Sequence, residues 1–362
     1  MPRLFLRKVY SMSHDQEHEP IDASHGNTQS PANPGRRQMF GQLLAGGAAI
    51  AAGGALVSNE EVVLATMLEG DTKNAPKDVE VDGLSGASRT HTNWAKYADL
   101  QEKVTTATIK GVKFSKMILG GNLIGGWAHA RDLIYVSELV KAYHTRDKIM
   151  ATFKMAEACG VTTYLGHSSH IGLMTDYWEK CDGGVNYIAD CGDIDGALRT
   201  IELGADAAYI QGETGDRLVR EGKFDEAAAF LERVKKEGVP AGLGGHRIET
   251  IRAFVEKGLE PDFWMKTIHH GNYWSRQPDR GERDNVFCRK PDETIAFMNT
   301  LKQPWIGFKV LAAGSIHPRD GFKYALEAGA DFLCVGMYDF QIVDDVNLYN
   351  EIAKSELKRN RP

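Results

Sequence analysis

The stretch Phe224–Leu243, FDEAAAFLERVKKEGVPAGL, contains a helix pattern followed directly by a strand pattern. From Phe224 to Glu237 the apolar residues recur on one face of a helix, and the charged residues occupy the other face. Gly238 comes next, and glycine readily adopts the left-handed conformation that closes a helix. The short apolar run Pro240–Leu243 then predicts a buried strand. The stretch therefore predicts one helix–strand repeat.

The same arrangement of a helix end, a glycine and a strand recurs along the chain, in EACGVTT, ELGADAA, KEGVPAG, EKGLEPD and EAGADFL. Short apolar runs predict eight strands, at Phe114–Leu119, Thr162–Leu165, Val185–Ala189, Ala207–Gln211, Pro240–Leu243, Asp262–Thr267, Gly307–Ala312 and Asp331–Val335. Eight such units in succession match the (β/α)8 barrel, or TIM barrel, in number, order and size. An open doubly wound sheet is the alternative, but such sheets seldom contain eight regular units. We therefore predict a single α/β barrel.

Composition excludes several classes of protein. The chain of 362 residues carries 43 basic and 49 acidic side chains, a formal net charge of −6, and this balance argues against a nucleic-acid partner. Its 42% hydrophobic and 25% charged residues are typical of globular proteins and not of disordered chains or polytopic membrane proteins. The five cysteines lack CxxC spacing, which argues against a disulfide framework or a zinc cage.

The N-terminal region differs from the rest. Arg36 and Arg37 precede a Gly/Ala-rich, weakly hydrophobic stretch from Gly41 to Val57. This arrangement resembles a twin-arginine export signal, which implies the twin-arginine export machinery as a partner and a periplasmic or secreted protein. Met39 stands where that motif usually has Phe. We expect a signal region at 1–57, a linker and N-terminal arm at 58–110, the barrel at 111–362, and no stable membrane span in the mature form.

The reacting groups of such barrels lie at the carboxyl ends of the strands, so the side chains there are the candidate site. We predict Lys266, Glu213 and His269 as catalytic residues. Predicted substrate-binding residues are Asn122, His129, Arg131, Gln211, Arg247, Trp274, Gly314 and Gly336. Together with Glu213, the histidines His167, His246 and His270 would suit a divalent metal (Zn, Mn, Co or Fe) that polarises a sugar carbonyl or hydroxyl. Alternatively, these histidines hydrogen-bond the substrate or cap helices.

Lys266 lies in WMKTIHH, inside an apolar strand, where an ammonium is costly to bury unless it is paired or its pKa falls. A lowered pKa would suit it to Schiff-base formation or proton abstraction. Class I aldolase barrels often carry their lysine on this strand. The alternative is a structural lysine paired with Glu213 across the barrel mouth.

Three stretches resemble known families. LAAGSIHPRDGFKYALEAGADFLCVGM resembles the closing units of phosphate-binding, aldolase-type barrels, which implies a phosphate held by backbone N–H groups near Gly314 and Gly336. KGVKFSKMILGGNLIGG resembles the first unit of aldo/keto reductases, but the stretch Thr162–His167 lacks the carboxylate that those enzymes need. NLIGGWAHARDLIYVS resembles part of an uncharacterised exported barrel family.

These observations favour an exported enzyme that acts on a carbohydrate or polyol by isomerase, epimerase or lyase (aldolase-type) chemistry, which needs an acid/base pair and an electrophile near a carbonyl. A NAD(P)-dependent oxidoreductase similar to aldo/keto reductases is the alternative enzyme. A binding protein on a degenerate barrel is the non-enzymatic alternative. The sequence leaves the substrate and the oligomeric state open.

Overall fold

The computed structural model describes residues 94–128, 133–273, 276 and 286–359. Eight parallel strands form a closed barrel in the order β10-β3-β4-β5-β6-β7-β8-β9. The barrel strands are β3 (Met117–Gly120), β4 (Thr163–His167), β5 (Asn186–Cys191), β6 (Ala207–Ile210), β7 (Ala241–Gly245), β8 (Phe263–Thr267), β9 (Trp305–Phe308) and β10 (Phe332–Val335). The predicted (β/α)8 fold is therefore confirmed.

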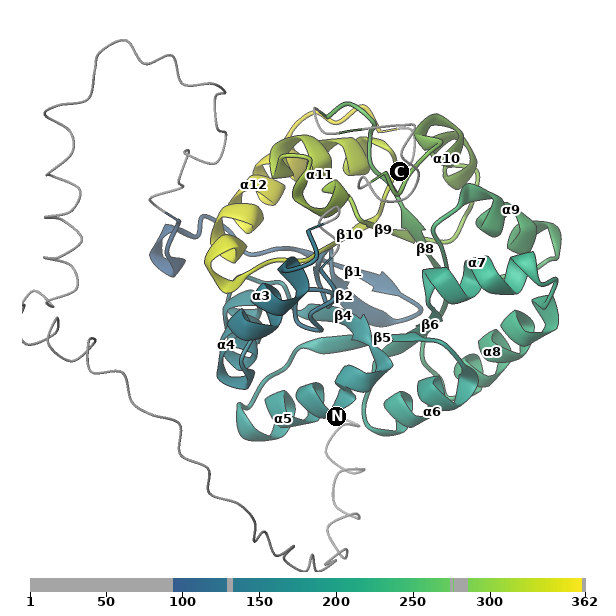
Figure 1. Cartoon of the computed structure of the whole chain (residues 1–362), viewed down its shortest axis with the longest axis horizontal. Coiled ribbons are helices and arrows are strands. Elements are labelled where there is room, and N and C mark those ends of the chain that lie inside the picture. The colour runs from purple at the N-terminus through teal and green to yellow at the C-terminus, as the bar shows by residue number, and fades with distance from the viewer. Residues whose placement is uncertain (1–93, 129–132, 274–275, 277–285, 360–362) are drawn as a thin grey trace, which may run out of the picture. The chain divides into compact units, whose positions relative to one another are not determined.

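Helices surround the barrel strands (Figure 1). They are α3 (Val136–Tyr143), α4 (Arg146–Ala158), α5 (Ile171–Lys180), α6 (Ile194–Glu202), α7 (Gly212–Arg220), α8 (Phe224–Lys236), α9 (Ile248–Glu256), α10 (Pro291–Met298), α11 (Pro318–Glu327) and α12 (Ile342–Lys354). In α8 the predicted apolar face is buried, through Ala227, Phe230, Leu231 and Val234. Gly238 follows this helix at a φ of 78°, the left-handed conformation expected of it. No helix among the described residues is long and apolar enough to cross a membrane.

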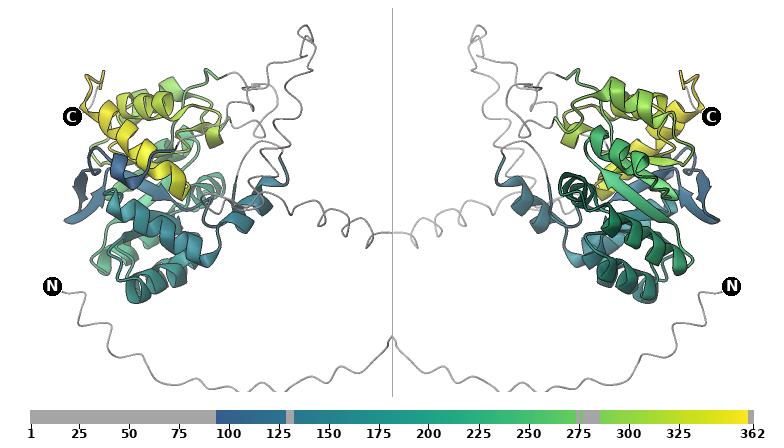
Figure 2. Two further views of the ribbon diagram at one scale, coloured as in Figure 1. Left: turned by 90° about the vertical axis from the view of Figure 1, so that its left-hand side faces the viewer. Right: turned by 90° about the vertical axis from the view of Figure 1, so that its right-hand side faces the viewer.

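An antiparallel hairpin that the sequence did not predict precedes the barrel. It consists of β1 (Thr106–Ile109) and β2 (Val112–Ser115). Ile109 and Phe114 are buried in the same apolar cluster as the inward-facing barrel residues. The hairpin and α3 lie at opposite ends of the barrel (Figure 2). The hairpin therefore closes the amino-terminal end and leaves the carboxyl ends of the strands for a site.

The predicted strands match the observed ones to within one or two residues at each end, except for two that differ by three or more residues at one end. Phe114, predicted to begin the first barrel strand, belongs to β2, and β3 begins at Met117. The predicted strand Gly307–Ala312 is instead Trp305–Phe308. The chain leaves the extended conformation there because Lys309 has a φ of 56° and Ala312 a φ of 45°. Such left-handed residues cannot continue a strand.

Residues 94–110, assigned to the N-terminal arm in the predicted organisation, include β1 and hydrogen bonds to α12. The backbone N–H of Ala95 donates to Asp344 at 2.9 Å, and that of Gln101 donates to Asn347 at 2.9 Å. This part of the arm is therefore attached to the barrel. The predicted signal region 1–57 lies outside the described residues.

Candidate functional site

Polar side chains gather where the inward-facing positions of the barrel strands reach the carboxyl end. Leu165, Ile188 and Tyr209 belong to the apolar cluster inside the barrel. Because side chains alternate along a strand, the residues two positions later face the same way. These residues are His167, Asp190 and Gln211. The interior of the barrel is therefore apolar below and polar at its mouth.

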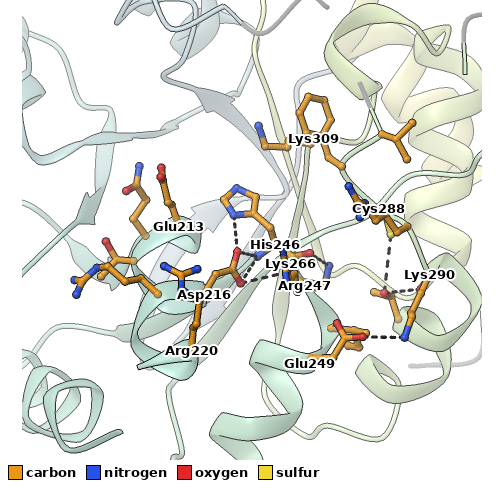
Figure 3. A pocket seen from close by; sticks show the side chains of 18 residues that line it. Glu213, Asp216, Arg220, His246, Arg247, Glu249, Lys266, Cys288, Lys290 and Lys309 are labelled. Atoms are coloured by element: carbon orange, nitrogen blue, oxygen red, sulfur yellow. Dashed lines mark hydrogen bonds and ion pairs between the residues drawn. The ribbon is translucent and has the colours of Figure 1, made fainter. Parts of the chain in front are cut away.

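A cavity of about 890 Å³ lies at the carboxyl ends of β6 to β9. One face of α7 along its length, the first turn of α9, the segment 286–290 and Lys309 line it. Figure 3 shows the ends of Glu213, His246 and Lys309 turned toward the same part of this cavity. Its volume falls within the range of about 300–1,000 Å³ that is common for small-molecule sites. This cavity is the candidate active site.

His246 is held by Asp216, which lies on α7. The His246 Nδ1 lies 3.0 Å from the Asp216 Oδ2, and the His246 backbone N–H also donates to this carboxylate. Since an ionised carboxylate only accepts hydrogen bonds, Nδ1 carries the proton and Nε2 is left as the basic nitrogen. The Phe308 ring lies 5.4 Å from the imidazole, centroid to centroid. Asp216 therefore fixes the orientation of a histidine that can act as a base.

Burial alone would raise the pKa of Asp216, but hydrogen bonds from His246 and Thr250 outweigh it and hold the pKa below the ordinary value. The Thr250 hydroxyl donates to Asp216 at 2.6 Å. Asp216 therefore stays ionised beside the imidazole, the arrangement that stabilises an imidazolium while the histidine holds a substrate proton.

Lys309 follows β9 directly, and its left-handed backbone directs the amine into the cavity. The ammonium lies 4.2 Å from the centroid of the Phe287 ring. Burial lowers the pKa of Lys309 to about 8, and nearby Glu213 opposes this shift. Within the described residues, no hydrogen bond or ion pair engages its Nζ. Lys309 is thus an amine that can be deprotonated near neutral pH and is open to a ligand.

Glu213, predicted as catalytic, lies in the first turn of α7 and lines the same cavity. It is exposed, so it can exchange protons with solvent. Gln211 lines the cavity from the residue before α7, and Arg247 lines it from the residue before α9. The structure therefore brings together Glu213, Gln211 and Arg247 from the predicted set, with His246.

Lys266 also borders the cavity, but its amine is engaged. Its neighbour Met265 faces the barrel interior, so Lys266 lies on the outer face of β8. Its Nζ donates to the backbone carbonyl oxygens of His246 at 2.6 Å and Thr267 at 2.7 Å. Burial lowers the pKa of Lys266 to about 8. The amine ties β8 to the end of β7, which holds His246 in place, and no pairing with Glu213 is present.

His269 uses both ring nitrogens to hold the chain. Its Nδ1 donates to the His270 carbonyl at 2.8 Å, and its Nε2 accepts the N–H groups of Phe287 at 3.1 Å and Cys288 at 2.8 Å. Burial lowers the pKa of His269 to about 4, so the ring stays neutral. In this arrangement His269 fixes the segment that carries Phe287 to the cavity and leaves no nitrogen for a substrate.

The predicted metal ligands are not brought together. Among the residues that the structure describes, no three His, Cys, Asp or Glu side chains form a group that could hold a metal ion. His246 is hydrogen-bonded to Asp216. The Nδ1 of His167 accepts the Ser169 N–H at 3.2 Å, and the Nδ1 of His270 accepts the Asn272 N–H at 3.1 Å. Each of these three histidines therefore makes a hydrogen bond within the chain, and His167 caps the short helix Ser168–His170. The metal stays a prediction for direct assay.

Asp190 provides a second carboxyl group at the mouth. It is the cross-strand partner of His167 in the pairing of β4 with β5. Burial raises the pKa of Asp190 to about 6, and the nearby His167 partly opposes this shift. Its Oδ1 is buried without a hydrogen-bond partner among the described residues. Asp190 can therefore hold a proton close to neutral pH, whereas Asp216 remains ionised.

The remaining predicted substrate-binding residues lie apart from the cavity or outside the described residues. Asn122 is exposed after β3, Gly314 lies in the β9–α11 loop, and Gly336 follows β10. None of these three lines the cavity. His129, Arg131 and Trp274 lie outside the described residues.

The sequence reasoning missed Lys309 and Asp216. Lys309 follows the apolar run WIGF, so the argument applied to Lys266, that a lysine in an apolar strand needs a reason, applied equally to it. Asp216 lies three residues after Glu213, and this spacing puts both on one face of a helix. Its pairing with His246 joins two different units of the barrel, and no local pattern reveals such a contact.

Comparison with known proteins shows the fold alone. No protein-family model matches the chain, and no curated protein matches it in sequence. A presumed aldo-keto reductase from Pseudomonas aeruginosa is similar in structure, with a TM-score of 0.52 and 14% identity over 71% of this chain and 99% of that chain. A second structure of a presumed aldo-keto reductase from Pseudomonas aeruginosa gives a TM-score of 0.51 and 15% identity, over 70% of this chain and 99% of that chain.

A truncated 3-deoxy-D-arabino-heptulosonate 7-phosphate synthase from Thermotoga maritima gives a TM-score of 0.41 and 13% identity, over 70% of this chain and 92% of that chain. The chain is thus a (β/α)8 barrel with distant structural similarity to aldo-keto reductases. Folds of this class host many unrelated reactions, so the activity must be argued from the site.

Proposed function

We propose that the protein is an enzyme of the lyase or isomerase type that reacts with the carbonyl group of a sugar-like substrate through Lys309. The observation that carries this proposal is the Lys309 amine, whose pKa burial lowers to about 8 and whose Nζ faces the cavity beside Glu213 and His246. At pH 7 an amine with a pKa of 8 is about 10% neutral, some 300 times the neutral fraction at a pKa of 10.5. Only the neutral amine is nucleophilic.

In the proposed reaction the neutral Lys309 amine adds to the substrate carbonyl carbon and forms a C–N bond. The resulting hydroxyl group leaves as water after it accepts a proton from Glu213 or solvent, and a C=N iminium remains. The iminium draws electrons from the neighbouring carbon. His246 Nε2 can then take a proton, either from that carbon in an isomerisation or from a β-hydroxyl in a retro-aldol cleavage. Asp216 stabilises the imidazolium that forms.

This proposal gives Lys266 a supporting role. Its amine donates hydrogen bonds to the carbonyl oxygens of His246 and Thr267, so it positions the end of β7. The sequence-based hypothesis that Lys266 itself reacts makes the opposite prediction in the same assays. The two lysines can therefore be tested side by side.

The proposal is tested by proton exchange, since isomerases and aldolases exchange a carbon-bound proton next to the carbonyl with solvent. The protein is incubated in D₂O with dihydroxyacetone, D-fructose and D-glucuronate, and deuterium at carbon is followed by NMR. Lys309→Met, His246→Ala and Glu213→Gln should each slow exchange, Lys309→Met by about 100-fold or more. Lys235→Met, at an exposed lysine of α8, is the control. Exchange at an unchanged rate in Lys309→Met would contradict the proposal, as would a nicotinamide-dependent oxidation that is insensitive to this change.

We further propose that the protein reaches the periplasm or exterior by the twin-arginine route, on the basis of Arg36 and Arg37. A divalent metal remains a separate proposal, based on the number of histidines near the strand ends. Elemental analysis of the natively produced protein tests it: a stoichiometric Zn, Mn, Co or Fe that Glu213→Gln and His246→Ala reduce would support it. Active protein without such a metal would contradict it.

A further inference from the structure

The candidate cavity has the opposite charge to the chain as a whole. Seven lysine and arginine side chains line it, against three carboxylates, Glu213, Asp216 and Glu249. The whole chain has a formal net charge of −6. An acidic protein that concentrates basic groups around one cavity attracts anionic ligands to it and repels cationic ones.

Two of the three carboxylates are already compensated by neighbours. Glu249 pairs with Lys290 at 2.9 Å, and Asp216 accepts hydrogen bonds from His246 and Thr250. The negative charge of Glu213 acts on Lys309 and partly opposes the lowering of its pKa. The seven basic side chains therefore outnumber the three carboxylates that line the cavity, and this difference favours an anion.

The basic groups of α7 lie on the face of the helix that borders the cavity. Glu213, Asp216, Arg217 and Arg220 occupy positions i, i+3, i+4 and i+7 of the helix, so they share one face. Arg217 reaches Glu221 at 3.3 Å, whereas Arg220 has no ion-pair partner within the part of the chain that the structure describes. Figure 3 shows the Arg220 guanidinium turned toward Asp216, at the side of the cavity away from Lys309.

We propose that the substrate carries an anionic group, a carboxylate or a phosphate, which binds Arg220 and Arg217 at the α7 side of the cavity while its carbonyl group lies at Lys309. This inference rests on the proposed function and adds the substrate class. The planar guanidinium suits both anions because it donates two parallel hydrogen bonds to their oxygens. Arg217, Arg220 and Lys309 line the same cavity, whose volume of about 890 Å³ suits a small molecule. This site differs from the one predicted near Gly314 and Gly336, neither of which lines the cavity.

The test is calorimetric titration of the purified protein with D-glucuronate, D-glucose 6-phosphate and neutral D-glucose. One of the two anions should bind at least tenfold more tightly than D-glucose, and the tighter one identifies the carboxylate or the phosphate. The joint variant Arg217→Gln, Arg220→Gln should lose at least tenfold of that affinity and leave D-glucose binding unchanged. Arg252→Gln is the matched control, because Arg252 lies on α9, pairs with Glu293 at 3.2 Å and does not line the cavity.

Equal affinity for D-glucose and both anions would overturn the inference. So would a preference for anions that survives in the joint variant but disappears in Lys309→Met, since Lys309 would then be the anion site. The proposed function fails separately: an anion that binds through the arginines but shows no Lys309-dependent proton exchange would leave the binding site standing and remove the reaction. Lys309-dependent exchange with neutral sugars, without a preference for anions, would support the reaction and contradict the anion site.

Discussion

Replacing Lys309 by methionine should stabilise the protein at neutral pH while it removes activity. Burial lowers the pKa of this amine from 10.5 to about 8, which corresponds to a cost of about 3 kcal/mol for keeping the ammonium in the cavity. Methionine has a similar length and no charge. It forfeits the contact of the ammonium with Phe287, worth about 0.5–2 kcal/mol. The net gain in the free energy of unfolding should be about 1–3 kcal/mol.

The gain should depend on pH in a defined window. The unfolded chain binds a proton at Lys309 up to a pKa of about 10.5, whereas the folded chain releases it near pH 8. Between these values the unfolded state carries more protons, so the wild-type protein gains stability as pH rises. Below pH 8 the full cost is present, and above about pH 10.5 it is gone. The advantage of Lys309→Met should therefore shrink by about 2.5 kcal/mol between pH 7 and pH 10.

Urea unfolding of the wild type and the variant at pH 7 and pH 10 measures this difference, and every other pH-dependent group cancels in the comparison. Lys323→Met, at an exposed lysine on α11, is the control and should change stability little at either pH. A Lys309→Met protein that is less stable than the wild type at pH 7, or a stability difference that is the same at pH 7 and pH 10, would refute the assignment of Lys309 as a partly buried amine whose charged form is destabilised.

Three further predictions follow from the same structure and sequence. Asp216→Asn should lower kcat/KM for deuterium exchange by about 100-fold or more, because the histidine beside it loses both its orientation and its counter-charge; a fall in stability with unchanged exchange would contradict this role. Ala313 has a φ of 54°, so Ala313→Gly should leave the stability in urea unfolding unchanged or raise it by up to about 1 kcal/mol. The control Ala228→Gly, within α8, should cost about 1 kcal/mol. Equal losses of stability in the two variants would contradict the strained turn. Replacing Arg36 and Arg37 with lysine should leave precursor in the cytoplasm on fractionation, and unchanged export would contradict the twin-arginine assignment.

The fold could be predicted because its signals are local. Gly160, Gly204, Gly238 and Gly329 each follow a helix with positive φ and precede a barrel strand, and this pattern recurs along the chain. The hairpin of β1 and β2 was missed because Phe114 reads as part of one continuous apolar run. Only the positive φ of Lys110 and Gly111 divides that run from the strand before it.

The site could be predicted less completely because it depends on direction and on contacts between units. The sequence places Lys266 and Lys309 alike, one in each of two neighbouring strands. In the structure Lys266 lies on the outer face of β8 with its amine on two carbonyl oxygens, whereas the left-handed turn at Lys309 opens its amine to the cavity. This difference is set by the direction of the chain at the end of each strand, and the residue types do not reveal that direction.

The most direct test of the central claim is borohydride trapping of the reacting lysine. The protein is incubated with dihydroxyacetone, glycolaldehyde and D-glucuronate in turn, reduced with sodium borohydride, digested and analysed by mass spectrometry. A carbonyl compound that undergoes exchange should leave its reduced adduct on the peptide containing Lys309, in the wild type and in Lys266→Met, and no adduct in Lys309→Met. An adduct on Lys266, or exchange that proceeds without any adduct on Lys309, would contradict the account.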